Sequence, residues 1–247
     1  MEKANVKLLT EDGRRIDGRG LNELRKFRVE AGVLKNADGS AYIELGRNKI
    51  MVAVYGPKEV HPRHEALPDR MLLRCRYSML PFSVADERKS PSPTRREVEI
   101  SKVIREALEP AIFLEEYPRT STDVFIEVIE ADGSTRVASI TAAAVALADA
   151  GIPMKDLVVG VSIGKIEGRL AIDLSGIEDQ RGEGDMPIAL MPRLNEITLL
   201  QADGSFSRDE IAQALQMVRE AAIKLYEEQR RALKDRYSKL PVEVEIT

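Results

Sequence analysis

Arginines occupy the first turn of two predicted helices, where the helix dipole disfavours positive charge. Arg95 and Arg96 open a helix that begins after Thr94, and Arg136 opens a helix that follows Gly133. A cation at such a position costs about 0.3 to 1 kcal/mol, whereas a charge-assisted hydrogen bond to an anion returns roughly 1.5 to 3 kcal/mol. We therefore expect a phosphate-like anion at these helix starts. The alternative is that the arginines simply extend into solvent.

A second group of residues with chemical potential is the acidic run between Ile177 and Met186, which two glycines interrupt. Within this run, Asp179 and Asp185 could close a short loop and converge on one point. Clustered carboxylates repel one another unless a proton or a cation lies between them. The options are general-acid chemistry, a magnesium site or plain solvent exposure. The last is the commonest outcome for an acidic loop with glycines.

Other catalytic chemistries have little support in the sequence. Both histidines, His61 and His64, lie in one short segment without the spaced partners of a zinc site. The nucleophile elbow, the P-loop and the GxGxxG pattern are absent. Covalent catalysis is therefore not indicated.

Composition limits the class of protein. The chain has 247 residues, 43% of them hydrophobic, so it can bury a sizeable core. Its net charge of −4 provides no global basic field, and any nucleic-acid binding must come from local patches. The single cysteine, Cys75, fits a reducing compartment, and neither a signal peptide nor a membrane-length apolar run is present. These features favour a soluble cytoplasmic protein.

Local chemistry predicts how three helices begin. Thr94 and Glu97 have the spacing of a capping box, and so do Ser207 and Glu210 before the last helix. The alanine-rich helix over 137–150 should be capped by Ser134 or Thr135. It is so apolar that we expect it to be buried, with its amino end lining a cleft.

The remaining pattern predicts an α+β fold with an internal duplication. Strand-like segments lie at 27–33, 41–45, 49–55, 72–80, 124–129, 157–163, 169–174, 187–190 and 196–201. Four strands followed by a helix occur twice. We expect a mobile amino-terminal arm over 1–20, one domain over 21–240 that is pseudo-duplicated near residue 155, and a carboxy-terminal tail over 241–247.

The combined motifs resemble the RNase PH family of phosphorolytic exoribonucleases over nearly the whole chain. They are the arginine pair, the Gly-Ser-Thr-Arg loop at 133–136 and the acidic run with Asp179 and Asp185. The segments at 34–40, 56–64 and 149–154 are similar to the exosome branch of the family. The resemblance implies an RNase PH-like fold, in which the duplicated sheet and helix units are of the kind in ribosomal protein S5 domain 2.

The resemblance also implies a role for each matching residue. Inorganic phosphate, the co-substrate, would be held by Gly133, Ser134, Thr135 and Arg136. RNA would be bound by Arg95, Arg96 and Arg63, the last at a narrow neck that single-stranded RNA threads. Asp185 would be the general acid and Asp179 its carboxylate partner, and the two would hold Mg²⁺.

The implied reaction is the release of nucleoside diphosphates from the 3′ end of single-stranded RNA, reversible to untemplated tailing. The implied partners are a catalytically silent RNase PH-like subunit, in a hexameric ring with three copies of each chain, and RNA-binding cap subunits. No membrane partner is expected. Two alternatives stay open: a homohexameric RNase PH that trims tRNA, and a ring subunit that binds RNA without cutting it.

Overall fold

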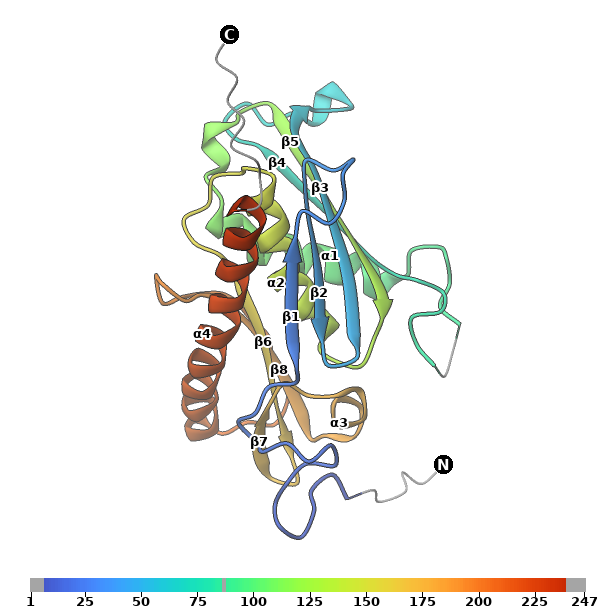
Figure 1. Cartoon of the computed structure of the whole chain (residues 1–247), viewed down its shortest axis with the longest axis vertical. Helices are drawn as coiled ribbons and strands as arrows, with labels where there is room; N and C mark the ends of the chain where they lie inside the picture. The colour runs from blue at the N-terminus through green and yellow to red at the C-terminus, as the bar shows by residue number, and fades with distance from the viewer. Residues whose placement is uncertain (1–6, 86–87, 239–247) are drawn as a thin grey trace.

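A computed structural model describes residues 7–85 and 88–238, so the predicted tail over 241–247 lies outside the described residues. Two five-stranded sheets lie one above the other in Figure 1, and the long helix α4 (Arg208–Ser238) runs alongside both. The predicted α+β class is confirmed. Among the described residues, no helix combines the length and the apolar character needed to cross a bilayer.

The first sheet has the order β1-β2-β3-β5-β4. Its neighbouring strands are antiparallel except for the parallel pair of β4 and β5. The strands are β1 (Phe27–Ala31), β2 (Gly39–Leu45), β3 (Asn48–Glu59), β4 (Leu72–Met79) and β5 (Thr120–Glu130). Short 3-10 turns lie at η1 (Arg63–Glu65), η2 (Glu109–Ala111) and η3 (Leu114–Glu116).

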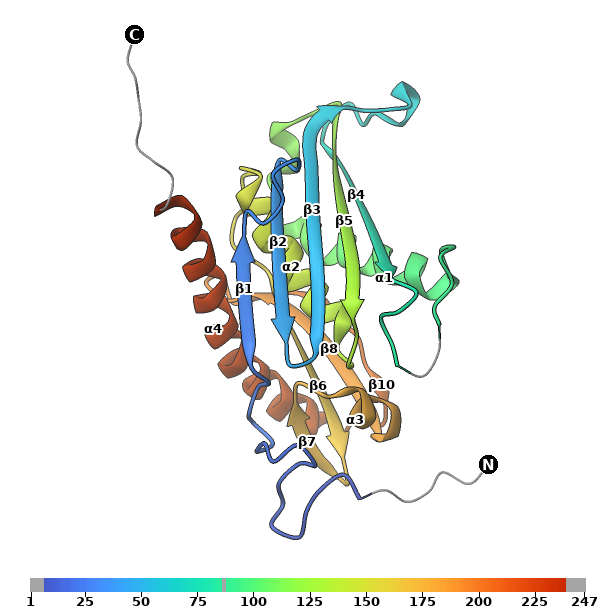
Figure 2. The same cartoon turned by 45° about the vertical axis from the view of Figure 1, so that its right-hand side comes forward.

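The second sheet has the order β10-β8-β6-β7, and β9 also pairs with β8. Every pairing in it is antiparallel. The strands are β6 (Val159–Ile166), β7 (Arg169–Ile172), β8 (Gly184–Met191), β9 (Glu196–Leu200) and β10 (Asp203–Gly204). The turned view in Figure 2 shows this sheet below the first one, with α3 (Gly176–Arg181) at its edge.

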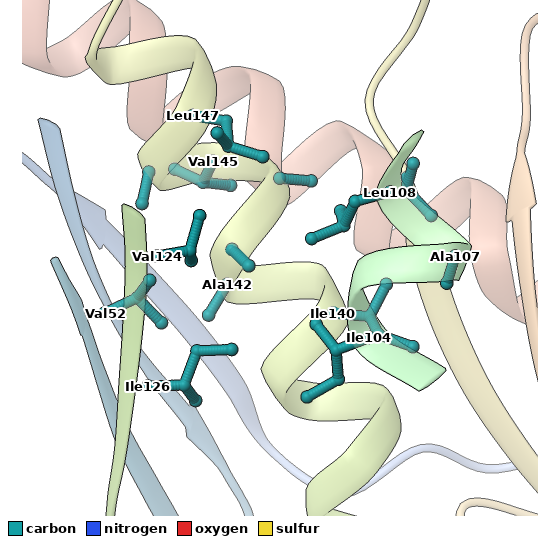
Figure 3. Packing of buried hydrophobic residues seen from close by; sticks show 14 of the residues in the cluster. Val52, Ile104, Ala107, Leu108, Val124, Ile126, Ile140, Ala142, Val145 and Leu147 are labelled. Carbon is teal, nitrogen blue, oxygen red and sulfur yellow. The ribbon is translucent and has the colours of Figure 1, made fainter. Parts of the chain in front are cut away.

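Helix α2 (Thr135–Asp149) is the centre of the core. Every residue from Val137 to Leu147 is buried, which confirms the expectation from its composition. Figure 3 shows α2 between strands of the first sheet and helix α1 (Arg95–Leu108), which supplies Ile104 and Leu108. Because its flanks are packed on both sides, the amino end of α2 is held firmly in place.

The amino-terminal segment differs from its prediction as a mobile arm. Residues 7–20 pack against the second sheet, where Leu8 and Leu9 join a small apolar cluster. Arg15 is fully buried and pairs with Glu178, and the amide of Leu8 donates to the Glu167 carboxylate at 2.6 Å. For residues 7–20 these are the contacts of a packed segment, and its polar appearance in the sequence hides partners that lie far along the chain.

Candidate active site

The start of helix α1 is satisfied by its own side chains. Glu97 donates its amide to Thr94 Oγ1 at 3.2 Å, and the Thr94 amide donates to Glu97 Oε2 at 2.7 Å, which confirms the predicted capping box. The other Glu97 oxygen accepts from the Met79 amide at 2.9 Å and so ties the helix to the end of β4. Arg95 and Arg96, in the same turn, are exposed to solvent.

The start of helix α2 is different, and the predicted cap by Ser134 or Thr135 is wrong. Ser134 has a left-handed backbone (φ 61°), and neither side chain caps the helix. The Ser134 hydroxyl instead donates to the Leu174 carbonyl at 2.8 Å and lies 2.6 Å from Ser162 Oγ. The first-turn amides of α2 are thus left to an external acceptor, which suits an oxyanion.

The side chains of this second helix start are held by neighbours. Tyr77 on β4 donates its hydroxyl to Thr135 Oγ1 at 2.9 Å. Burial raises the pKa of Tyr77 to about 12, so it stays a protonated donor at neutral pH. Arg136 donates to the side-chain oxygen of Gln201 and lies 3.7 Å from the carboxylate of Glu99. The hydroxyl and the guanidinium are therefore oriented in advance of any ligand.

The sequence suggested that the acidic run is a loop, but part of it is regular structure. Its first part forms α3, in which the Glu178 carboxylate accepts from the Ser175 amide at 2.8 Å and from its hydroxyl at 2.7 Å. Glu178 points inward to Arg15, and Asp179 lies on the same short helix. Asp185 is the second residue of β8. The two aspartates are thus placed by regular elements, with the turn at Gly182 between them.

Asp179 and Asp185 form one electrostatic group with both helix starts. Burial raises the pKa of each carboxyl, and the charge of Asp179 raises that of Asp185 further. Arg96 and Arg136 oppose both of these shifts in pKa, so a side chain from each helix start acts on each aspartate. The structure therefore brings together residues from three separate parts of the sequence.

Arg63 is placed elsewhere. It lies on η1, at the end of the first sheet opposite to α3 in Figures 1 and 2, and its side chain is 80% exposed. It pairs with Glu59 at 2.9 Å, and Arg74 nearby pairs with Glu65 at 2.7 Å. Exposed ion pairs of this kind are weak, so an anionic ligand could displace the carboxylates.

The donors available for a metal are few. Within residues 7–85 and 88–238, no group of three or more histidine, cysteine or acidic side chains is placed to hold a metal ion. Mg²⁺ in substrate-assisted sites uses one or two carboxylates, with waters and substrate phosphates completing its shell. The two aspartates match that donor set, because a cation between them would relieve the repulsion that raises the pKa of Asp185.

Sequence reasoning missed three residues that contact the start of α2: Tyr77, Gln201 and Ser162. Tyr77 lay in the apolar phase of a predicted strand, which gave no sign that its hydroxyl would reach Thr135. Gln201 lies 65 positions from the arginine that it contacts. Pairings at such separations leave no local signal in one sequence.

The chain is similar in sequence to a known family and to named proteins. The model described as "3′ exoribonuclease family, domain 1" matches residues 23–153, and the corresponding domain 2 model matches residues 156–221. "Exosome complex component Rrp41" of Thermococcus onnurineus is 59% identical over 240 residues, which cover 97% of this chain and 96% of that protein. The Pyrococcus abyssi protein of the same name is 58% identical over 246 residues, which cover 99% and 98%.

Solved structures give a consistent result. Rice Rrp46 superposes with a TM-score of 0.79 at 25% identity, covering 89% of this chain and 100% of that one. A structure described as the Archaeoglobus fulgidus exosome with RNA bound to the active site gives a TM-score of 0.76 at 25% identity, covering 88% and 93%. The fold that the sequence resemblance implied is thereby confirmed.

Proposed function

This chain belongs to the RNase PH family of 3′ exoribonucleases, and from that premise we propose that it is the catalytic RNase PH-like subunit of an archaeal exosome. It shortens single-stranded RNA from the 3′ end, with inorganic phosphate as co-substrate, and releases nucleoside diphosphates. The observation that carries this proposal is the start of α2. Its amides have no side-chain cap from Ser134, and Thr135 and Arg136 are oriented by hydrogen bonds to Tyr77 and Gln201. Arg136 also interacts electrostatically with Asp185, a carboxyl of raised pKa.

Different residues bind the phosphate, bind the RNA end and donate the proton. The 133–136 loop and the Arg136 guanidinium hold the attacking phosphate, while Arg95 and Arg96 bind the phosphates of the RNA end. An oxygen of the bound phosphate forms a bond to the last phosphorus of the RNA, and the bond from that phosphorus to the penultimate 3′ oxygen breaks. Asp185 gives its proton to the leaving oxygen, directly or through a water.

The raised pKa of Asp185 supports its role as the acid, since burial and the charge of Asp179 favour its protonated form. Asp179 and Asp185 are the residues that would hold Mg²⁺. Its charge there would offset that of the phosphate oxygens and would oppose the shift that raises the pKa of Asp185. Because one phosphate ester replaces another, the reaction also runs in reverse when diphosphates are abundant. It then adds untemplated tails to RNA.

The relatives named above are exosome components, which supports a proposal for the partners. We assign this chain to a hexameric ring in which three copies alternate with three copies of a catalytically silent RNase PH-like subunit, with RNA-binding cap subunits on one face. Arg63, exposed at the far end of the first sheet, contacts the incoming single strand. A cytoplasmic location fits the sole cysteine, Cys75, which is a free thiol.

The relatives also bear on the two alternatives. A ring subunit that only binds RNA would have no need for a prearranged anion site beside two aspartates of raised pKa. A homohexameric RNase PH that trims tRNA would share the site. The identity of 58% to 59% with exosome components over nearly the whole chain favours the exosome subunit.

The test is to incubate the chain, alone and with its presumed silent partner, with end-labelled single-stranded RNA and Mg²⁺. We expect nucleoside diphosphates only when inorganic phosphate is added. Release of monophosphates without phosphate would contradict the proposal, and so would the lack of any product from the assembled ring. Trimming of tRNA by the chain alone, as a hexamer of one subunit, would favour the tRNA-trimming enzyme.

A further inference from the structure

A buried network of arginines and carboxylates joins the amino-terminal segment to the second half of the chain. Its members and their exposed fractions are Arg15 0%, Arg19 9%, Arg25 8%, Asp173 2% and Glu178 1%. Charges buried to this extent are stable only when they are paired and hydrogen-bonded, so the network fixes the geometry of the segments that carry it.

Arg25 makes the central connection in this network. Towards Asp173 it donates its amide and Nε to Oδ2, at 2.8 and 3.0 Å, and its Nη2 to Oδ1 at 2.6 Å. From the same guanidinium, Nη1 donates to the Asp132 carbonyl at 2.6 Å and Nη2 to the Gly133 carbonyl at 3.5 Å. One side chain thus connects a buried carboxylate to the turn that begins the phosphate-binding loop.

That turn needs support, because its backbone is unusual. Gly133 has φ 71° and Ser134 has φ 61°, two left-handed residues in succession. A Cβ at position 133 would lie 2.7 Å from the carbonyl carbon of Ser175, so the turn packs directly on the chain entering α3. The Gly176 amide donates to Asp132 Oδ1 at 3.1 Å across the same junction. The conformation is determined by contacts with this distant segment.

The network also reaches the helix that carries Asp179. Arg15 Nε donates to Glu178 Oε1 at 2.7 Å, and Glu178 directly precedes Asp179 on α3. The same buried group therefore touches both the anion-binding turn and the acidic helix.

We propose that Arg25 and Asp173 are positioning residues of the catalytic centre: they hold the 132–134 turn so that the loop amides and Arg136 face the attacking phosphate. This inference rests on the proposed phosphorolytic function. It assigns to Arg25, which lies 108 positions before Gly133, a specific effect on the use of phosphate and little effect on the binding of RNA.

The test compares two buried aspartates in the ring assembled with its partner. Asp173→Asn weakens the ion pair and hydrogen bonds to Arg25. The control residue is Asp156, which is 6% exposed, accepts hydrogen bonds from Tyr226 and Arg193, and does not contact the 133–136 loop. We expect Asp173→Asn to raise the KM for phosphate about tenfold or more, with RNA affinity unchanged. Asp156→Asn should leave the KM for phosphate unchanged. An equal rise in both variants would overturn the proposal, because it would reflect general loosening.

Arg25→Lys is the second variant, and it guards against a failure of Asp173→Asn to fold. Lysine keeps the charge for Asp173 but cannot also reach the two carbonyls, since it lacks the guanidinium fork. We expect a raised KM for phosphate in a protein that still folds but melts at a lower temperature. A wild-type KM in a folded Arg25→Lys protein would overturn the positioning role alone. If the wild-type ring itself released no diphosphates, the proposed function would fail instead.

Discussion

The two helix starts with arginines in their first turns differ in how their first-turn backbone amides are satisfied. At α1 the chain caps its own amides, through Thr94 and Glu97, and the arginine pair projects into solvent. At α2 no side chain of the described residues caps the amides, and Arg136 is held by Gln201 and Glu99. The first start is complete without a ligand, while the second has fixed donors and an unused set of amides.

This difference indicates two kinds of anion. Fixed donors lose little entropy on binding and suit a compact oxyanion such as inorganic phosphate. Exposed arginines on a self-capped helix can follow a flexible chain of phosphates, as a single-stranded RNA end requires. In the proposed mechanism Asp185, whose pKa is raised by burial and lowered in part by Arg136 and Arg96, acts between the two anions.

The largest expected effect comes from removing the proposed acid while leaving both anion sites intact. Asp185→Asn should lower kcat about 100- to 10,000-fold, because the amide cannot donate a proton to the leaving oxygen. Phosphate and RNA affinity should both be retained, since neither helix start is altered. Single-turnover release of diphosphate, measured beside filter binding of RNA, checks this. A variant that turns over normally would exclude Asp185 as the acid.

The next test removes the fixed arginine of α2. Arg136→Ala should raise the KM for phosphate about 10- to 100-fold, because a charge-assisted hydrogen bond in a partly buried site is lost. The RNA dissociation constant should stay within about twofold in the absence of phosphate, as expected if a different group binds RNA. The comparison of the two starts breaks down if the variant loses RNA affinity and keeps its phosphate requirement.

The exposed pair at α1 should give the reverse result. Replacing Arg95 and Arg96 by alanine should weaken RNA binding and lower the slope of log affinity against log salt by roughly 0.7 for each lost phosphate contact. The KM for phosphate should stay near the wild-type value, measured at saturating RNA. Arg105→Ala, on the last turn of the same helix, is the matched control and should leave the salt slope unchanged.

Much of the fold could be predicted because its signals are local. The helices α1 and α4 begin at capping boxes readable within four residues, and the apolar run of α2 identified it as buried. The alternating residues of β4 gave its extent within one residue. The short helix α3 was missed because half of its six residues are charged and the helix carries no apolar period.

The site could be predicted only in part, for the same reason. Arginines in a first turn and paired aspartates are visible in the sequence, whereas the groups that orient them are not. Ser134 has the chemistry of a cap, but its left-handed backbone sends the hydroxyl to Leu174. Arg15 lies in the segment that was predicted to be a mobile arm, yet its partner Glu178 lies 163 positions away. Long-range pairing decides these details.

A smaller effect concerns pH. Burial first, and then the charge of Asp179, raise the pKa of Asp185, and an acid catalyst works only while it is protonated. When both proteins are measured at saturating Mg²⁺, so that metal occupancy is the same, Asp179→Asn removes that negative charge, the pKa of Asp185 falls and the alkaline limb of kcat moves to lower pH. The residual activity of the variant, followed from acid to alkaline pH, checks the direction. A limb that moves to higher pH would show that the two carboxyls do not interact as described.

The smallest effect on activity should come from the cap of α1, and it tests whether that start is purely structural. Thr94→Ala removes the acceptor for the Glu97 amide and should lower the free energy of unfolding by about 1 kcal/mol, measured by denaturant titration. Phosphate KM and RNA affinity should not change, because the arginines stay on a helix whose buried face still packs. Thr94→Ser keeps a hydroxyl acceptor and should retain most of the stability. If Thr94→Ala instead raised the KM for phosphate, the α1 start would belong to the phosphate site, and the division of the two anions between the two helices would be wrong.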